Sequence, residues 1–279
     1  MLFPMFYGFI APDAAIAHPL NAVKVAVNLA GKLDAQLSVA IGARQLSVPS
    51  LIVSSTVEGL VGAENKRATD SAAMAKDRIL ELASISGMAL HAEILKGDLN
   101  QLKVRFSRRA RLYGLVIAEL GRPGELLGGE LIEPLIFESG RPVLVLPNGY
   151  DKEVSLDQIV VAWDGSVGAA RAVWDSLILL KLCKRIEIVT ITGEKNLSDT
   201  APGSSLAPML SYLGKDINVT PIKYDGSSAA ALIREHAAKI GAGVIVQGAY
   251  GRSRWREFVL GGVTREMLRD CDMPVMMCH

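Results

Sequence analysis

The stretch VIVQGAYGRSRWREFVLGGVTREMLRDCDMPV, from Val244 to Val275, decides the fold because three elements of an α/β protein follow one another in it. An apolar run predicts a buried strand, Gly248 and Gly251 bracket a turn, and Gly261-Gly262 opens an amphipathic helix after nine further residues. Glycine lets the backbone approach a ligand closely, and a helix start presents unpaired N–H groups to an anion. This order predicts a phosphate-binding loop and therefore a nucleotide site.

Length and composition limit the class of protein. A chain of 279 residues, half of them hydrophobic, predicts about two domains of ~140 residues, each with its own core. The formal net charge is +1, from 30 Lys and Arg against 29 Asp and Glu, so the basic face of a nucleic-acid-binding protein is not expected. No apolar run approaches the ~20 residues that cross a bilayer, so no membrane partner is expected.

The cysteines and histidines do not predict a disulfide framework or a metal site. Cys183, Cys271 and Cys278 are widely spaced, and the four histidines show no paired spacing. This pattern favours a reducing cytoplasm. The apolar N-terminus is compatible with a first strand or an export signal, and the lack of Lys or Arg before it favours the strand.

Apolar runs alternate with helical periodicity throughout the second half. This pattern predicts a parallel sheet covered by helices on both faces. The expected strands are 158–163, 185–191, 217–224, 243–247 and 274–278. The expected helices are 166–182, with Ser166 as a possible N-cap, and 205–213, 228–240 and 263–271.

The first half repeats the same order, which indicates a duplicated domain. Its expected strands are 5–10, 37–41, 88–95, 115–118 and 142–146, and its expected helices are 20–33, 65–86, 99–112 and 131–139. The polar segment 148–153 predicts a linker. The expected domains are therefore residues 1–150 and 151–279.

With these residues in place, the chain resembles a tandem universal stress protein. The resemblance rests on IVVAWDGS (159–166), on the G-A-Y-G loop with Gly261 nine residues beyond it, and on the closing Met273-Pro274-Val275. It implies α/β architecture: two tandem five-stranded parallel-sheet domains of the Rossmann-like, adenine-nucleotide-binding type, packed as a pseudo-dimer. It also implies that the last strands, 142–146 and 274–278, pair with each other. The family's nucleotide-binding motif has Ser or Thr where this chain has Gly262.

The resemblance also implies a binding site for ATP in the second domain alone. Asp164 and Ala162 would lie on the ribose or adenine side, Ile191 at the adenine edge, and the glycine loop around the phosphates. The implied binding residues are Ala162, Asp164, Ile191, Gly248, Gly251, Arg252, Gly261, Gly262 and Val263.

Some of these residues also have a structural interpretation. Asp164 could cap the next helix, Gly248 and Gly251 could form a turn without a ligand, and the loop arginines could be solvated. In the first half Glu119 stands in the place of Gly248 and Glu130 in that of Gly262. Because carboxylates repel phosphate, we expect the first half to bind no nucleotide and to act as a structural partner.

Three functions remain open at the sequence level. The first is a cytoplasmic stress-response protein that binds an adenine nucleotide and could form a homodimer. The second is an interaction or signalling scaffold without nucleotide, which the loss of the hydroxyl at position 262 favours. The third is a slow ATP hydrolase; no Walker motif or catalytic triad supports an ordinary enzyme.

Overall fold

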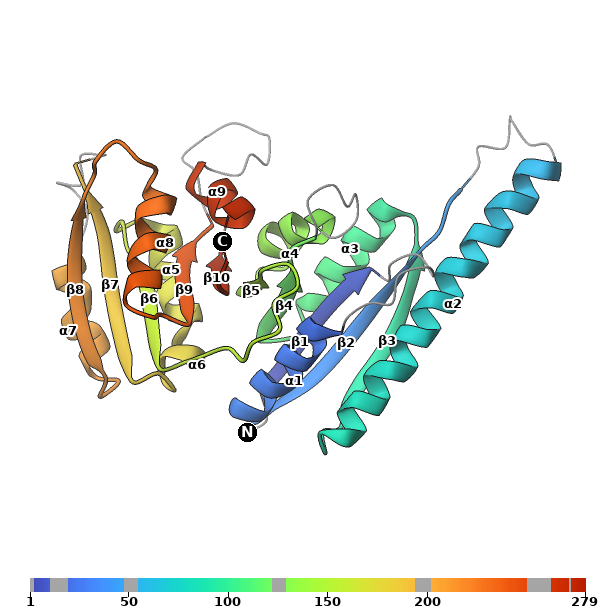
Figure 1. The fold of residues 1–279 in the computed structure, drawn as a ribbon, viewed down its shortest axis with the longest axis horizontal. Helices are drawn as coiled ribbons and strands as arrows, with labels where there is room; N and C mark the ends of the chain where they lie inside the picture. The colour runs from blue at the N-terminus through green and yellow to red at the C-terminus, as the bar shows by residue number, and fades with distance from the viewer. Residues whose placement is uncertain are drawn as a thin grey trace. The chain divides into compact units, whose positions relative to one another are not determined.

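The computed structural model describes residues 3–10, 20–47, 55–121, 129–193, 202–249, 262–270 and 272–279. It divides into two compact units (Figure 1). The first unit runs to Ser139 and includes the linker segment Asn148–Glu153, whereas the second comprises Gly140–Pro147 and Val154–His279. Strands alternate with helices in both units, which confirms the predicted α/β class.

The first unit contains four parallel strands in the order β3-β2-β1-β4. Their bounds are Phe3–Ile10 for β1, Ala35–Arg44 for β2, Leu90–Gly97 for β3 and Leu115–Glu119 for β4. The apolar N-terminus thus forms a strand, as predicted. It lies between β2 and β4, and the side chains of Met5, Phe6 and Tyr7 are fully buried, which explains its continuous hydrophobic run.

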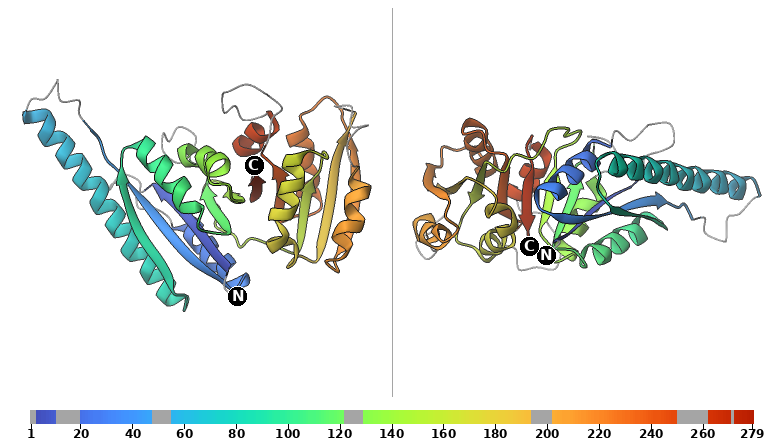
Figure 2. Two further views of the ribbon diagram at one scale, coloured as in Figure 1. Left: turned by 180° about the vertical axis from the view of Figure 1, so that it is seen from behind. Right: turned by 90° about the horizontal axis from the view of Figure 1, so that it is seen from below.

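Helices cover both faces of this sheet. Figure 2 shows α1 (Asn21–Lys32) and α2 (Ser55–Ile85) on one face and α3 (Leu99–Ala110) and α4 (Ile132–Glu138) on the other. A short 3-10 turn, η1 (Gly129–Leu131), precedes α4. Asp98 caps α3 through a capping box with Gln101: each side chain accepts a hydrogen bond from the other residue's backbone N–H.

The helix α2 begins ten residues before the predicted start at Asn65. A tertiary contact ties it to the end of β2: the backbone N–H of Leu46 donates to Asn65 Oδ1 at 2.6 Å, and Asn65 Nδ2 donates to the Leu46 carbonyl at 3.0 Å. The buried residues of α2 all lie in its second half. Its first turns therefore lack the apolar periodicity that a sequence prediction needs, and the prediction began the helix at Asn65 instead of Ser55 for this reason.

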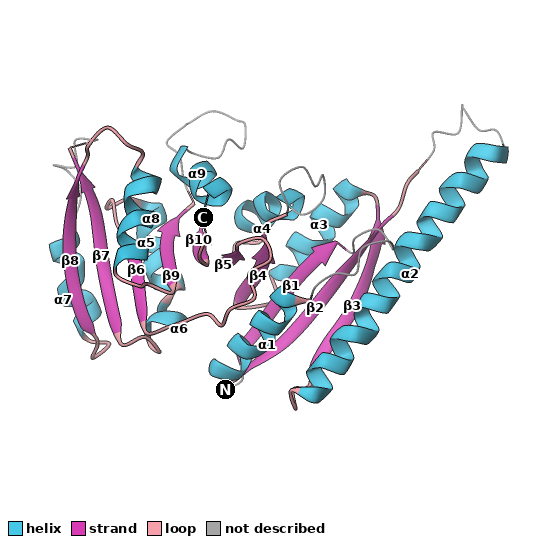
Figure 3. Cartoon of the chain, in the orientation of Figure 1, coloured by secondary structure: helices cyan, strands magenta, loops and turns pink. Residues whose placement is uncertain are grey.

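The second unit contains six strands in the order β5-β10-β9-β6-β7-β8 (Figure 3). The pair β5–β10 is antiparallel, with Val275 opposite Val145 and Met277 opposite Val143. This confirms the predicted pairing of the two last strands. The remaining pairs are parallel. The bounds are Val143–Leu146 for β5, Gln158–Ala162 for β6, Arg185–Thr192 for β7, Asp216–Lys223 for β8, Val244–Gly248 for β9 and Val275–Cys278 for β10.

One face of this sheet is covered by α5 (Val167–Asp175), α6 (Leu177–Leu180) and α7 (Gly203–Ser211), and the other by α8 (Ala229–Lys239) and α9 (Gly262–Asp270) (Figure 2). The predicted helix 166–182 is broken at Ser176. Its buried hydroxyl donates to the Val173 carbonyl at 2.8 Å, an interaction that competes with the regular helical pattern.

A buried carboxylate lies in the core of this unit. Glu187 of β7 is 5% exposed, and it accepts hydrogen bonds from Thr220 Oγ1 at 2.5 Å and from His236 Nε2 at 3.1 Å, if that nitrogen carries the proton. The contact between Glu187 and His236 joins β7 to α8. Among the helices of the described ranges, none combines the length and apolar character needed to cross a bilayer.

Candidate functional site

The strand order of the second unit reverses between β6 and β9. From β6 the chain proceeds outward to β7 and β8, and then returns to the other side of β6 as β9. The connections that follow β6 and β9 therefore leave in opposite directions and open a crevice at the carboxyl ends of these strands. The predicted residues Ala162, Asp164 and Gly248 all lie at this end of the sheet.

Asp164 follows β6 and is exposed to solvent. Its Oδ1 atom accepts a hydrogen bond from the backbone N–H of Ser166 at 3.0 Å, which is an Asx-turn. The N-cap of α5 is Ser166 itself, whose hydroxyl accepts from the N–H of Ala169 at 3.1 Å. The interpretation of Asp164 as the cap of the next helix is therefore wrong.

Gly248, the last residue of β9, has a packing role that the sequence did not reveal. A Cβ atom at this position would lie 2.6 Å from the carbonyl carbon of Gly168 and 2.8 Å from the backbone nitrogen of Ala169. Backbone atoms cannot move aside as a flexible side chain can. Glycine is therefore required for the close approach of β9 to the first turn of α5.

Gly262 and Val263 form the first turn of α9 and line a pocket of about 380 Å³. A Cβ atom at Gly262 would meet nothing within 4 Å. The opposite wall comes from the β8–α8 connection, which sequence reasoning did not include in the binding site. The full lining is Tyr224, Gly226, Ser227, Ser228, Ala229, Gly262, Val263 and Glu266.

The β8–α8 connection is a polar turn followed by a helix cap. The Oδ1 atom of Asp225 accepts from the backbone N–H of Ser227 at 2.9 Å and from its hydroxyl at 2.5 Å, and these bonds lower the pKa of Asp225. Ser228 caps α8 by accepting from the N–H of Ala231. Two helix starts, those of α8 and α9, thus line one pocket. The sequence Asp225-Gly226-Ser227-Ser228 carried the turn and cap signal that could have identified this wall.

Ile191 lies near the end of β7, half-buried like Ala162. Ala162 pairs with Val189 of β7, and Ile191 follows two residues later, so both side chains project from the same face of the sheet. The predicted residues Gly251, Arg252 and Gly261 lie outside the described residues.

Gln247 is the polar residue of β9 that sequence reasoning missed. Its side chain is 3% exposed, and within the described residues neither Nε2 nor Oε1 has a hydrogen-bond partner. Buried amides are ordinarily paired. The signal in the sequence was a single glutamine at the end of the apolar run Val244-Ile245-Val246.

The equivalent positions of the first unit carry carboxylates with partners inside that unit. Glu119 Oε1, at the end of β4, accepts from the backbone N–H of Gly149 at 2.9 Å. Glu130, in the turn before α4, pairs with the ammonium of Lys103 on α3. Burial, and then the charge of Glu119, raises the pKa of Tyr7 well above its ordinary value.

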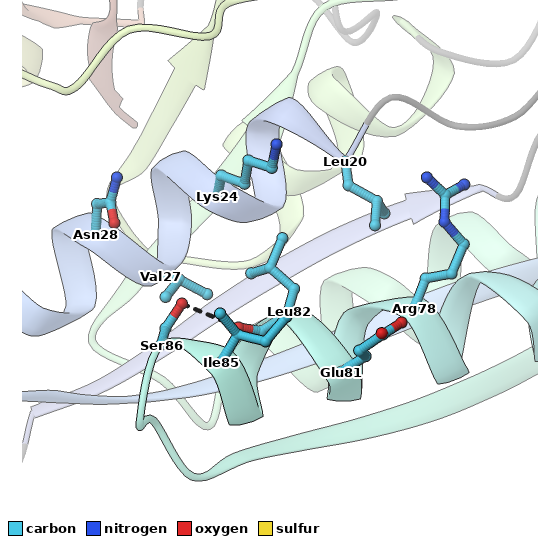
Figure 4. Close-up of a pocket in the computed structure, with 9 residues that line it drawn as sticks. All are labelled: Leu20, Lys24, Val27, Asn28, Arg78, Glu81, Leu82, Ile85 and Ser86. Carbon is cyan, nitrogen blue, oxygen red and sulfur yellow. Dashed lines mark hydrogen bonds between the residues drawn. The ribbon is translucent and has the colours of Figure 1, made fainter.

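A second pocket, of about 510 Å³, lies between α1 and α2 of the first unit (Figure 4). Its lining mixes Lys24, Arg78 and Glu81 with apolar side chains such as Leu82 and Ile85. Except for Leu20, which precedes α1, the lining residues come from these two helices and the turn after α2. The pocket therefore lacks the strand-end geometry of a nucleotide site.

The residues at the carboxyl end of the second sheet fit an adenine nucleotide in part. A Cβ atom at Gly262 would meet nothing within 4 Å, which suits the approach of an anion to the first N–H groups of α9. The Gln247 amide, which has no partner among the described residues, offers a donor group and an acceptor oxygen. Among the described residues, no group of three or more His, Cys, Asp and Glu side chains is placed to hold a metal ion.

Fold and site together define a Rossmann-like α/β protein. Residues 155–279 match the model of the Universal stress protein family. The chain is similar in structure to a universal stress protein from Archaeoglobus fulgidus DSM 4304, with a TM-score of 0.68, 16% identity, and coverage of 99% of this chain and 97% of that one. It is also similar to a functionally unknown protein from Pseudomonas aeruginosa PAO1, with a TM-score of 0.59, 15% identity, and coverage of 98% and 92%. No curated protein matches.

These comparisons have different weight for the two halves of the chain. The family match supports a universal stress protein domain in the second half. At 15–16% identity the structural similarities show the fold alone, and they extend it over the first half as well.

Proposed function

We propose that the chain is a tandem universal stress protein, with domains 1–150 and 151–279, whose second domain binds ATP. The observation that supports this most directly is the convergence of Asp164, Gly248 and the start of α9 at one end of a parallel sheet, within the segment that matches the family model. Ligands of open α/β sheets bind at such a place.

The proposed pose runs along the carboxyl ends of three strands. The phosphates lie against the N–H groups of Gly262 and Val263, where the helix start favours negative charge. Gly251, Arg252 and Gly261 complete the phosphate loop in this proposal. The ribose lies near Asp164 and Ala162, and the adenine edge meets the backbone near Ile191. In this proposal the protein acts in a cytoplasmic stress response, with a homodimer as a possible assembly, and its first domain binds no nucleotide.

Calorimetric titration of the whole chain with ATP tests the proposal. We expect one site per chain and a dissociation constant between about 1 μM and 1 mM, the range for a site that has lost one charge-assisted bond. Absence of binding with about 100 μM protein and ATP raised above 1 mM would overturn the nucleotide claim.

A matched pair of variants locates the phosphate. Gly262→Glu introduces the residue that the first unit has at the equivalent position, Glu130. Gly262→Gln introduces a side chain of nearly the same size without the charge. Because a Cβ atom at position 262 meets nothing within 4 Å, both variants should fold. We expect the carboxylate to weaken ATP binding at least about a hundredfold and the amide less than about tenfold. Equal affinities for the two variants would argue against phosphate binding at the start of α9.

One observation favours a second function, a scaffold that acts through protein contacts. Position 262 lacks the hydroxyl of the family's nucleotide-binding motif. A wild-type protein that does not bind ATP, with a cooperative unfolding transition, would support this alternative.

A further inference from the structure

The buried amide of Gln247 lies on the sheet face that the proposed nucleotide would meet. Glu187, which bonds to His236 of α8, is paired with Val160, and Val160 is paired with Ile245. Side chains alternate between faces along a strand. Gln247, two residues beyond Ile245, therefore projects from the face that α8 and α9 cover, opposite the face where Gly248 meets α5.

The same register brings Gln247 beside Ala162. The pairs Val160–Ile245 and Val161–Val246 continue one step further to Ala162 and Gln247, across the point where the strand order reverses. Ile191 lies one strand beyond, on β7. Along the carboxyl edge of the sheet, Gln247 thus stands between the start of α9 and the β7 strand end.

The hydrogen-bonding groups of the Gln247 amide indicate which part of the nucleotide it would bind. Nε2 can only donate and Oε1 can only accept, and both atoms are buried without a partner among the described residues. Phosphate oxygens accept only, so they would leave Oε1 unpaired. The β7 strand end, where the proposed adenine edge lies, is two strands from Gln247, about 10 Å at ~4.8 Å per strand. The amide is therefore too far away to bind the adenine. A vicinal diol donates and accepts at adjacent oxygens, as ribose hydroxyls do.

We infer that Gln247 is a specificity-determining residue that binds the ribose hydroxyls of the nucleotide through its side-chain amide. This inference rests on the proposed ATP site and adds to it a selection of ribonucleotides over 2′-deoxyribonucleotides. It also explains why a glutamine occupies a buried strand position: the amide is satisfied when the ligand is bound.

The test compares Gln247→Met, of similar length and without polar atoms, with the wild-type protein. Removing an unpaired buried amide should leave the thermal midpoint of the ligand-free protein unchanged or raised. ATP affinity should fall about tenfold to a hundredfold, because two hydrogen bonds are lost. A residue with a purely structural role would give the opposite result, a lower midpoint and an unchanged affinity.

Titration with 2′-deoxy-ATP provides the second readout. The wild-type protein should bind it about tenfold more weakly than ATP, and Gln247→Met should bind the two ligands equally. The control is Gln158→Met, at the opposite end of β6, where the amide already accepts from Arg185 Nη1 at 3.3 Å; its affinities should match the wild type.

The outcomes separate this inference from the function on which it rests. A wild-type protein that does not bind ATP overturns both. ATP binding by the wild type with an unchanged affinity in Gln247→Met, or equal wild-type affinities for ATP and 2′-deoxy-ATP, overturns the role of Gln247 and leaves the proposed function standing.

Discussion

The carboxyl ends of β4 and β9 hold the same place in the strand order of the two units, yet they carry residues of opposite character. Glu119, at the end of β4, extends a carboxylate to the N–H of Gly149. Gly248, at the end of β9, has no side chain and lets α5 approach to backbone contact. The strand end of the first unit thus carries an anionic side chain, whereas that of the second unit carries none and packs closely against α5.

The same difference recurs one element later. In the first unit Glu130 pairs with Lys103, and in the second Gly262 leaves the helix start open. Both carboxylates of the first unit have partners inside that unit. We therefore interpret the departures from the glycine motif as substitutions that stabilise a structural unit, and the glycines of the second unit as positions that serve packing at β9 and ligand access at α9.

The largest expected effect separates these two glycines. Gly248→Ala places a Cβ atom against the Gly168 backbone, so we expect a loss of about 3 kcal/mol or more in unfolding free energy. Gly262→Ala meets open space within a helix and should change stability by less than about 1 kcal/mol. All three tryptophans lie in the second half, at 163, 174 and 255, so tryptophan fluorescence during urea unfolding reports on this unit. Similar midpoints for the two variants would contradict the packing role of Gly248.

Glu119→Gly brings the residue of the second unit into the first. Loss of the carboxylate that accepts from Gly149, together with the added flexibility of glycine, should cost about 2 kcal/mol. Circular dichroism should show an earlier unfolding transition of the first unit, and Glu119→Gln, which keeps an acceptor, should lose less. Calorimetry should still find one ATP site per chain. A second site would show that Glu119 alone prevents binding in the first unit.

Gly262→Ser restores the hydroxyl of the family motif. A charge-assisted bond from this hydroxyl to a phosphate should tighten ATP binding about tenfold, which corresponds to ~1.4 kcal/mol. Gly262→Ala is the control, because it adds the Cβ atom without the hydroxyl. Titration of both variants with ATP measures the difference, and equal affinities would place the phosphate away from residue 262.

Helices and strands could be predicted from the sequence where the apolar pattern of one continuous segment determines them. Each of the ten expected strands has an observed counterpart. Fully buried strands such as β5 and β10 are continuous apolar runs, whereas β8 is largely exposed. The early start of α2 was missed because its buried residues all lie in its second half, so that its first turns carry no apolar periodicity. At the candidate site, two features depend on tertiary contacts. The packing role of Gly248 depends on Gly168, and the importance of Gln247 appears only once its strand neighbours and its missing partners are known.

The smallest expected effect concerns the ion pair that replaces an open helix start in the first unit. The Lys103 and Glu130 side chains are 27% and 37% exposed, so solvent weakens their attraction. Lys103→Met keeps the apolar stem and removes the charge, and it should cost less than about 1 kcal/mol. Because salt screens partly exposed charges, the difference in unfolding free energy between this variant and the wild type should shrink in about 1 M NaCl. The control is Lys24→Met, at an exposed position on α1, which should change the unfolding free energy little in either condition. A loss that persists at high salt would show that Lys103 stabilises the first unit through packing, and would remove the electrostatic part of the contrast between Glu130 and Gly262.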